Sequence, residues 1–397
     1  MSERGPLRGV RVLDLSIALT GPYAVALLAD QGAEVVKVER PGIGDIARWI
    51  GVSVHGMSAL FQMCNRGKRS IAVDVHDPAG RGIVRRLARE ADVVVQNFRP
   101  GVVERLGLAD VDLRRENPEL VYVSISGFGP TGPYALKGAY DTVIQAYGGL
   151  AANQADPETG EPRFLNQTAA DKITALVAAQ AITAALFARE RGAGGQHVEL
   201  SMLDAVVSFL WADAAGNEVL LDADGSRASS FVANFRPFHF LDGWGIATPT
   251  SDADFAGLCR AFGVDGCDDP RVATIAARNE HRALTRAIMD RCYAAARAQT
   301  TAGAMRRLEA ERVPCGVVLS PAELAADPHA QAIGLLVDSQ HPVAGRVRQP
   351  RHPVRFGRTP ADLGGPAPGL GEHTDEILAG LGLADRQDAW RAAGVVA

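Results

Sequence analysis

The sequence has few of the features that mark secreted or membrane proteins. It contains five cysteines among 397 residues, with no CxxC pair and an odd count, so a reducing compartment is expected. The first residues, MSERGPLRG, lack the apolar core of a secretory signal. No uninterrupted apolar run reaches the ~18 residues that a membrane span needs. We therefore expect a cytoplasmic protein without a membrane segment.

An excess of positive charge is also lacking. The formal net charge is −5, which argues against a nucleic-acid-binding protein, because such proteins bind by neutralising phosphates. Hydrophobic residues make up 47% and charged residues 22%, which is ordinary for a globular protein and excludes general disorder. Any anionic ligand must therefore be held by local basic residues.

Two common catalytic patterns are missing. The nine histidines form no HxxxH or HxH pair, so no metal site is expected, and His197 lies in a strand pattern that favours a structural role. The GxSxG turn of serine hydrolases does not occur either. The chemistry must rest on other residues.

The opening of the chain predicts a compact β-α-β unit. Val10–Leu15 and Ala33–Glu39 are apolar, β-branched runs, and a helical segment opens between them at Gly21-Pro22. Ligands of such units bind at the carboxyl ends of the strands. Two segments follow the strands and are expected to line a site: Ser16–Gly21 and Arg40–Gly42.

The alternation of strands and helices continues along the chain. Further strands are expected over residues 69–75, 92–98, 119–128 and 196–202, and helices over residues 78–91, 171–191 and from 203 towards 221. This order predicts a mostly parallel, Rossmann-like sheet with helices on both faces, and the fold class is α/β.

Composition suggests how the chain is divided. The small polar run DADGSRASS reads as a linker, FRPFHFLDGWGIATPT as a hairpin turning at Asp242-Gly243, and a Pro- and Gly-rich stretch follows the later helical segments. We expect four parts: a large domain over 1–221, a linker over 222–235, a smaller α+β domain over 236–330, and a return segment with a C-terminal helix packing on the large domain over 331–397.

Asp171 is the leading candidate for catalysis. It begins a helix that is almost entirely small or apolar, where an aspartate often serves only as a cap for the first amides. The helix dipole also favours the charged form of such a carboxylate, which keeps it available as a nucleophile at neutral pH. Both roles remain open on the residues alone.

The chain resembles the family III CoA-transferases, which include formyl-CoA and carnitine CoA-transferases and α-methylacyl-CoA racemases. The resemblance rests on the opening segment Val10–Gly42, on RERGAGGQHVELSMLDA over residues 189–205 and on GEHTDEIL over residues 371–378. It implies exchange of CoA between an acyl-CoA and a free carboxylic acid, with Asp171 as the covalent nucleophile. It further implies an interlocked homodimer and no cofactor, since coenzyme A is substrate and product.

The resemblance also suggests a coenzyme A site. It implies contacts from Arg40 after the second strand, from Asn97 and Phe98 at the end of a buried strand, and from Arg105 just beyond. An amide, an aromatic face and a guanidinium suit adenine and phosphate. NRGKRS places Lys68 and Arg69 before another strand, as either a solvated charge cluster or a phosphate contact.

Tyr140 bears on the type of reaction and is also assigned to the CoA site. Racemases of the family usually carry a histidine there and use it with the following aspartate, Asp141, as an acid/base pair, whereas transferases commonly carry tyrosine. The resemblance therefore favours transfer. An α-methylacyl-CoA racemase or isomerase and a CoA-binding protein without catalysis remain alternatives. The acyl donor and the acceptor acid stay open.

An NAD-dependent oxidoreductase is a further alternative. It rests only on GFGPTG, Gly127–Gly132, which matches GxGxxG after a strand. Pro130 interrupts the helix that should follow, and no acidic residue ends a following strand about 20 residues on.

Overall fold

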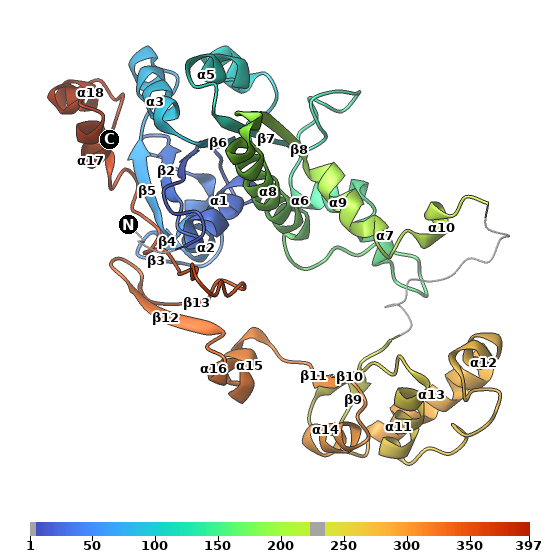
Figure 1. The fold of residues 1–397 in the computed structure, drawn as a ribbon. Coiled ribbons are helices and arrows are strands. Elements are labelled where there is room, and N and C mark those ends of the chain that lie inside the picture. Colours follow the sequence, from blue (N-terminus) through green and yellow to red (C-terminus); the bar gives the residue numbers. More distant parts are fainter. Residues whose placement is uncertain (1–4, 223–234) are drawn as a thin grey trace. The chain divides into compact units, whose positions relative to one another are not determined.

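The computed structural model describes residues 5–222 and 235–397. The described chain forms two compact units, the first built from residues up to Ala212 and from Gly334 onward, and the second from Asp213–Ile333 (Figure 1). Most of the expected linker, residues 223–234, lies outside the described residues.

A six-stranded parallel sheet organises the first unit. Its strands lie in the order β5 (Lys68–Ala72), β2 (Glu34–Glu39), β1 (Arg11–Asp14), β6 (Val93–Gln96), β7 (Val121–Ser126) and β8 (His197–Ser201). Counted along the chain within this sheet, the order is 3-2-1-4-5-6, that of the doubly wound dinucleotide-binding folds. The predicted Rossmann-like parallel sheet is confirmed, and its order reverses between β1 and β6.

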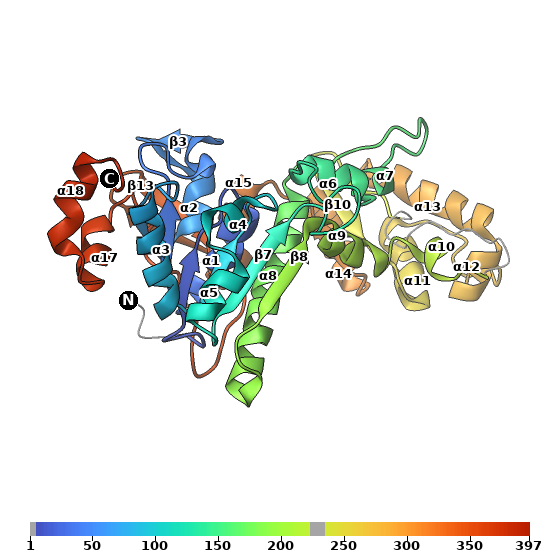
Figure 2. The ribbon, with the colours of Figure 1, turned by 90° about the horizontal axis from the view of Figure 1, so that it is seen from above.

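Two helices cover one face of this sheet. α1 (Thr20–Asp30) and α8 (Ala169–Ala188) pack on it and on each other (Figures 1 and 2). Their buried side chains are mostly small, so that the two helices approach the valine-rich strands closely. The core on this face includes Val12, Ala24, Val25, Leu28, Val93, Val95, Val123, Ala175, Ala178 and Ile182.

Three further helices cover the opposite face. They are α3 (Pro78–Glu90), α5 (Asp110–Glu116) and α17 (Thr374–Gly380). The C-terminal residues also pack here: the amide of Asp74 donates to the carbonyl of Val395 at 2.8 Å, and Val73 forms a β-bridge with Val396. The last part of the chain therefore contributes to the core of the first unit.

In the part of the chain that the structure describes, one helix could cross a membrane by length and composition alone. It spans Ala169–Ala193 and comprises α8 and a π-helical turn (Arg189–Ala193). The sequence predicts no membrane span because its uninterrupted apolar runs are too short. This helix is a candidate only when up to two charged residues are allowed within 18 positions. A core helix passes the same test, and Ala175, Ala178 and Ile182 of α8 are buried on the sheet. We treat α8 as a core helix.

The remaining elements of the first unit are short. They are η1 (Ile46–Trp49), β3 (Ser53–Val54), β4 (Met57–Ser58), α2 (Ala59–Asn65), α4 (Val102–Leu106), α6 (Asp141–Tyr147), α7 (Leu150–Asn153), α9 (Met202–Trp211), β12 (Leu336–His341), β13 (Gly345–Pro350), η4 (Ala384–Arg386) and α18 (Gln387–Ala392). Two differ from expectation. α9 ends at Trp211 rather than near Leu221, and the Pro- and Gly-rich return contains the antiparallel hairpin β12–β13.

The second unit combines helices with a small antiparallel sheet. Its strands lie in the order β11 (Cys315–Val317), β10 (Trp244–Ala247) and β9 (Phe238–His239). Its helices are α10 (Gly216–Val219), α11 (Asp252–Phe262), α12 (Ile275–Glu280), α13 (Arg282–Ala296), α14 (Thr301–Ala310), α15 (Pro321–Ala326) and α16 (Pro328–Ala332). The predicted hairpin at Asp242-Gly243 is confirmed, since Trp244 pairs with His239.

Candidate active site

The loop that follows β1 lies where the strand order of the sheet reverses. Asn97, just after β6, holds this loop with two hydrogen bonds: its Oδ1 accepts from the Ile17 amide and its Nδ2 donates to the Ile17 carbonyl, both at 2.8 Å. The next residue, Ala18, has a left-handed backbone with φ of +66°. An alanine in that conformation costs roughly 1–2 kcal/mol and persists only where its surroundings fix it. Here the Ala18 amide donates to Asp45 Oδ1 at 2.8 Å.

A close contact fixes where α1 leaves this loop. A Cβ atom built on Gly21 would lie 2.3 Å from the Cβ of Ser16, well inside van der Waals contact. Only glycine therefore allows the first turn of α1 to pack on the loop. The arrangement places Thr20, the first residue of α1, at the carboxyl edge of the sheet.

The side chain of Thr20 meets Asp171 in the first turn of α8. The Thr20 hydroxyl donates a hydrogen bond to Asp171 Oδ1. The amide of Asp171 donates to Asp141 Oδ2 at 3.0 Å, and Thr168 at the N-cap makes no side-chain cap. Asp141 therefore caps α8, and the carboxylate of Asp171 is not used as a cap.

The pKa of Asp171 is raised from its usual value to about 6. Burial is the main cause, the hydrogen bond from Thr20 opposes it, and the nearby charge of Asp141 adds to it. The helix dipole was expected to favour the charged form, but desolvation outweighs it. With this pKa the carboxylate is still mostly ionised at neutral pH, but a small fall in pH protonates it.

Asp141 is itself held in place by a polar network. It is 6% exposed, and Gln145, one helical turn along α6, donates from Nε2 to Asp141 Oδ1 and to the Gln167 carbonyl at 3.0 Å. The Gln145 Oε1 accepts from the Leu165 amide at 3.0 Å. α6 is thus fastened to the segment that leads into α8, which fixes the backbone of Asp171.

A buried charge cluster lies beneath the loop after β1. We define it by three acids and three bases: Asp14, Glu39, Asp45, Lys37, Arg48 and Lys68. Lys37 Nζ lies 2.8 Å from Asp45 Oδ2 and donates to the Ser16 carbonyl at 2.8 Å. The opposite charges balance, which a set of buried charges requires.

The pKa values in this cluster follow from the pairing. Burial disfavours the ammonium of Lys37, but the carboxylates of Asp14 and Asp45 outweigh burial and raise its pKa. Burial likewise opposes the charge on Asp14, yet Lys68 and Lys37 lower its pKa. The pairing therefore favours the charged forms of Lys37 and Asp14, and the cluster anchors the loop through the hydrogen bond from the Ala18 amide to Asp45.

Four of the residues assigned to coenzyme A follow the strands at the carboxyl edge of the sheet. Arg40 directly follows β2 and is exposed, and Arg105 is exposed on α4 after β6. Asn97 holds the loop as described, and Phe98 packs at the edge of the core. The structure adds a structural role for Asn97 that sequence reasoning missed, while the contacts with coenzyme A remain predictions.

The structure does not favour a phosphate contact for Lys68. An ammonium has three donors, and those of Lys68 reach Asp14 Oδ2 at 2.7 Å, the Pro22 carbonyl at 2.9 Å and Asn65 Oδ1 at 2.9 Å. Burial lowers the pKa of Lys68 to about 8, although Asp14 opposes this. The sequence predicts a strand from Arg69, with Lys68 before it, whereas β5 begins at Lys68 and buries this side chain.

Arg69 and Tyr140 have different surroundings. Arg69, also at the amino end of β5, pairs with Glu376 of α17 at 2.9 Å. Tyr140 is 75% exposed and precedes α6, next to Asp141. Tyr140 therefore adjoins the Asp171 site through its neighbour Asp141. Among the described residues, no hydrogen bond or ion pair joins Arg69 to that site.

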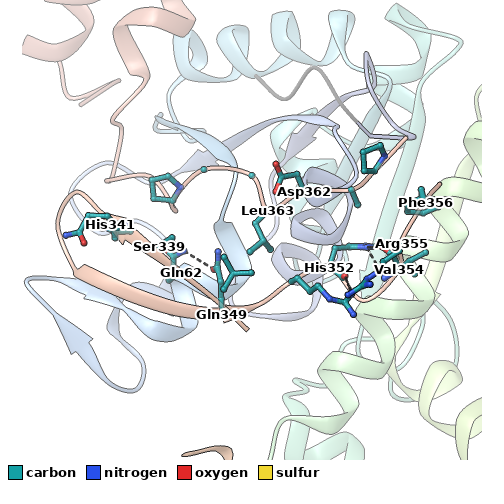
Figure 3. Close-up of a pocket in the computed structure, with 18 residues that line it drawn as sticks. Gln62, Ser339, His341, Gln349, His352, Val354, Arg355, Phe356, Asp362 and Leu363 are labelled. Carbon is teal, nitrogen blue, oxygen red and sulfur yellow. Dashed lines mark hydrogen bonds between the residues drawn. The ribbon is translucent and has the colours of Figure 1, made fainter. Parts of the chain in front are cut away.

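Two cavities of the first unit lie away from Asp171 and from most of the residues assigned to coenzyme A. One, of about 590 Å³, lies between the hairpin β12–β13 and the return segment (Figure 3). Gln62 and Gln349 face each other in it at 3.3 Å, with His341 towards one end. A second, of about 700 Å³, adjoins the amino ends of β2 and β5, including Lys68 and Arg69. We therefore identify the candidate site by the carboxylate of Asp171 and its hydrogen-bond partners, and not by the size of a cavity.

The sequence placed Thr20 in the segment Ser16–Gly21 that was expected to line a site, but it indicated no role for this residue and did not predict the buried charge cluster. Lys37 was detectable, because a lysine inside the valine-rich strand EVVKVE must find a carboxylate if that strand is buried. No sequence pattern indicated the hydrogen bond from Thr20 to Asp171, because the two residues are 151 positions apart.

Comparison with known proteins identifies the family of this chain. The family model described as CoA-transferase family III matches residues 7–374. The succinate–glutarate CoA-transferase of Agrobacterium fabrum is 36% identical over 97% of this chain and 98% of its own length, and the formyl-CoA:oxalate CoA-transferase of Bradyrhizobium diazoefficiens is 33% identical over 96% and 95%. A crystal structure of a CAIB/BAIF family protein from Brucella suis matches with a TM-score of 0.81 and 35% identity, over 96% of this chain and 100% of that one. The chain belongs to CoA-transferase family III.

Proposed function

We propose that this CoA-transferase works through covalent intermediates on Asp171. Membership of the family makes the reaction an exchange of CoA between an acyl-CoA and a carboxylic acid. One observation carries the proposal: the carboxylate of Asp171 is partly buried at the carboxyl edge of the sheet and is not used to cap its helix. Such a group is available to attack a carbonyl.

The exchange requires four displacements. Asp171 attacks the thioester carbonyl, the carbon–sulfur bond breaks, and CoA thiolate leaves a mixed anhydride on the enzyme. The thiolate attacks the Asp171 carbonyl and expels the first acid, which gives an aspartyl-CoA thioester. The acceptor carboxylate attacks this thioester and releases the thiolate. The thiolate then attacks the new acyl group, which forms the product thioester and restores the Asp171 carboxylate.

Coenzyme A is proposed to bind at the carboxyl edge of the sheet through Arg40, Asn97, Phe98, Arg105 and Tyr140. The position of four of them after β2 and β6 supports this, because ligands of doubly wound sheets bind there. Lys68 is left out because its donors are occupied, and Arg69 because it pairs with Glu376. No further cofactor is proposed.

We infer that the acids exchanged are short dicarboxylic acids. The relatives named for succinate, glutarate and oxalate support this class. An exchange assay with succinyl-CoA against glutarate, oxalate and a monocarboxylic acid of equal length measures the preference. Equal rates for the monocarboxylic acid would contradict it.

A homodimer and a cytoplasmic location are also proposed. The helix α8 leaves Leu176 and Phe187 more than half exposed, and such apolar surface suits a second chain. The five cysteines are free thiols, which fits a reducing compartment.

Asp171→Ala tests the mechanism directly. We expect the variant to fold and to lose exchange of CoA, because no nucleophile remains. Treatment of the wild type with borohydride during turnover should reduce the thioester at Asp171, as read by peptide mass spectrometry. Full exchange by the variant, or a label at another residue, would defeat the mechanism.

A further inference from the structure

Thr20 distinguishes the two oxygens of the Asp171 carboxylate. Its hydroxyl donates to Oδ1, and within residues 5–222 and 235–397 no group donates a hydrogen bond to Oδ2. The two oxygens of a free carboxylate are equivalent, and rotation about the Cβ–Cγ bond exchanges them. A donor fixed on one side removes that equivalence.

The position of Thr20 is set by rigid surroundings. It is 4% exposed and begins α1, which packs along α8 through Ala24, Leu28 and Ala178. The loop before it is held by Asn97 and by Asp45 of the buried charge cluster. The hydroxyl and the carboxylate are therefore carried by elements that cannot easily separate.

We infer that Thr20 holds Oδ1 of Asp171 so that Oδ2 alone bonds to the substrate, and that its hydroxyl then stabilises the charge on Oδ1 when the Asp171 carbonyl is attacked. The inference rests on the proposed covalent mechanism. It makes Thr20 a catalytic residue, because it touches a reacting atom.

The chemistry follows from the bonds that break. In the mixed anhydride Oδ2 is the bridging oxygen and Oδ1 the carbonyl oxygen. When the thiolate attacks the Asp171 carbonyl carbon, negative charge develops on Oδ1, and the Thr20 hydroxyl already points at that atom. No proton is transferred; the hydrogen bond shortens as charge grows and relaxes when the acid leaves.

Oxygen atoms also move in a way that can be counted. The first acid departs with Oδ2, because the bond between that oxygen and the Asp171 carbonyl carbon breaks. The acceptor acid supplies one oxygen in its place, and that oxygen stays on Asp171 after the last step. If Oδ1 is held by Thr20, it is never replaced, however many turnovers occur.

The test uses an acyl-CoA with an excess of its own acid labelled with ¹⁸O, in unlabelled water. Digestion with trypsin releases the peptide Phe164–Lys172, FLNQTAADK, in which Asp171 is the only acidic side chain. After many turnovers we expect one ¹⁸O atom in this peptide from the wild type. This count needs no variant.

Variants of Thr20 test the cause. Thr20→Val keeps the shape of the side chain and removes the donor, so we expect kcat to fall by roughly 10²–10³-fold with little change in KM for the acyl-CoA. We expect both Asp171 oxygens to become labelled. Thr20→Ser should restore the single label and most of kcat, and Thr20→Ala replaces Thr20→Val if the latter does not fold. Thr174→Val, a buried threonine that bonds only to its own helix, is the matched control.

The outcomes separate the inference from the mechanism. Two ¹⁸O atoms in the wild type, or a single label and a kcat within twofold of wild type in Thr20→Val, overturn the role of Thr20 and leave the covalent mechanism intact. Exchange without any label at Asp171 in the wild type overturns the covalent mechanism, and the inference with it.

Discussion

The carboxylate of Asp171 combines two properties that usually exclude each other. Burial raises the pKa of this carboxyl to about 6, and among the described residues no backbone amide donates to it as it would in a helix cap. The cap of α8 is supplied by Asp141 instead. A neighbouring carboxylate thus leaves Asp171 available for attack and also raises its pKa through charge repulsion.

The first prediction concerns the acid side of the pH–rate profile. Attack requires the ionised form, so kcat/KM should fall as the pH drops through about 6. The charge that raises the pKa of Asp171 is that of Asp141 on α6. Asp141→Asn keeps an acceptor for the Asp171 amide and removes the negative charge, so the acid limb should move to lower pH. Asp385→Asn, on the surface, is the control and should leave the limb in place; an unmoved limb in Asp141→Asn would contradict the assignment.

The second prediction concerns the buried charge cluster. Lys37→Met removes the ammonium that lies 2.8 Å from Asp45 and leaves buried carboxylates unpaired. The free energy of unfolding should fall by about 3–5 kcal/mol, measured by urea denaturation. Arg11→Ala, which breaks the exposed pair with Glu90, should cost no more than about 1 kcal/mol. Similar losses for the two variants would show that the cluster does not support the fold.

The residues of the site were predictable to different degrees. Asp171 and Arg40 stand beside recognisable strands and helices, so the sequence placed them. The donor on Asp171 is Thr20 from another helix. The structure does not favour the phosphate contact suggested for Lys68, because its three donors reach Asp14, Pro22 and Asn65. Partners that are distant in sequence depend on packing, which local patterns do not contain.

At the scale of the element, the contact between α1 and α8 positions the proposed nucleophile and its hydrogen-bond donor. Each helix carries one half of the hydrogen bond from Thr20 to Asp171, and small residues let the two helices lie close. A change in their separation would therefore act on catalysis as well as on stability.

The third prediction tests this contact. Ala178 on α8 is fully buried, and Ala178→Leu adds a large side chain to a packed interface. Overpacking should cost about 1–3 kcal/mol of unfolding free energy and lower kcat, because the helices must move apart. Gln180→Ala, on the exposed side of the same helix, should leave both unchanged. Loss of stability with full kcat would contradict the link between helix spacing and catalysis.

Elements with strong periodicity were predicted well, and irregular ones were not. The six strands of the sheet and α3 follow the expected order. The hairpin β12–β13 was missed because its strands, LVDSQH and GRVRQP, are polar and end in turn-forming residues. Such strands are defined by their pairing with each other rather than by an apolar face.

At the scale of the whole molecule, the first unit is completed by the end of the chain. Ile377, Leu378 and Val396 fill the core beside Ile71 and Val73 of the sheet. The chain leaves this unit for residues 213–333 and then returns to it. Such connectivity permits, for two copies, the linked rings that the resemblance to the family implies.

The fourth prediction concerns this assembly. Light scattering should give twice the mass of one chain, and the dimer should persist on dilution, because linked chains cannot part without unfolding. Mixing tagged and untagged dimers should yield no mixed species until the protein is unfolded and refolded. Active monomers, or rapid exchange of subunits in the native state, would rule out interlocking.

The sequence by itself determined the α/β class, the Rossmann-like sheet and the position of Asp171 at the start of a helix. These depend on patterns within single segments: apolar runs, turn residues and periodicity. Only the tertiary structure decided that Asp141 caps that helix, that Thr20 donates to one oxygen of Asp171, and that Lys68 is buried. Those features arise from contacts between segments far apart in the chain, where close packing and the pairing of buried charges select the partners.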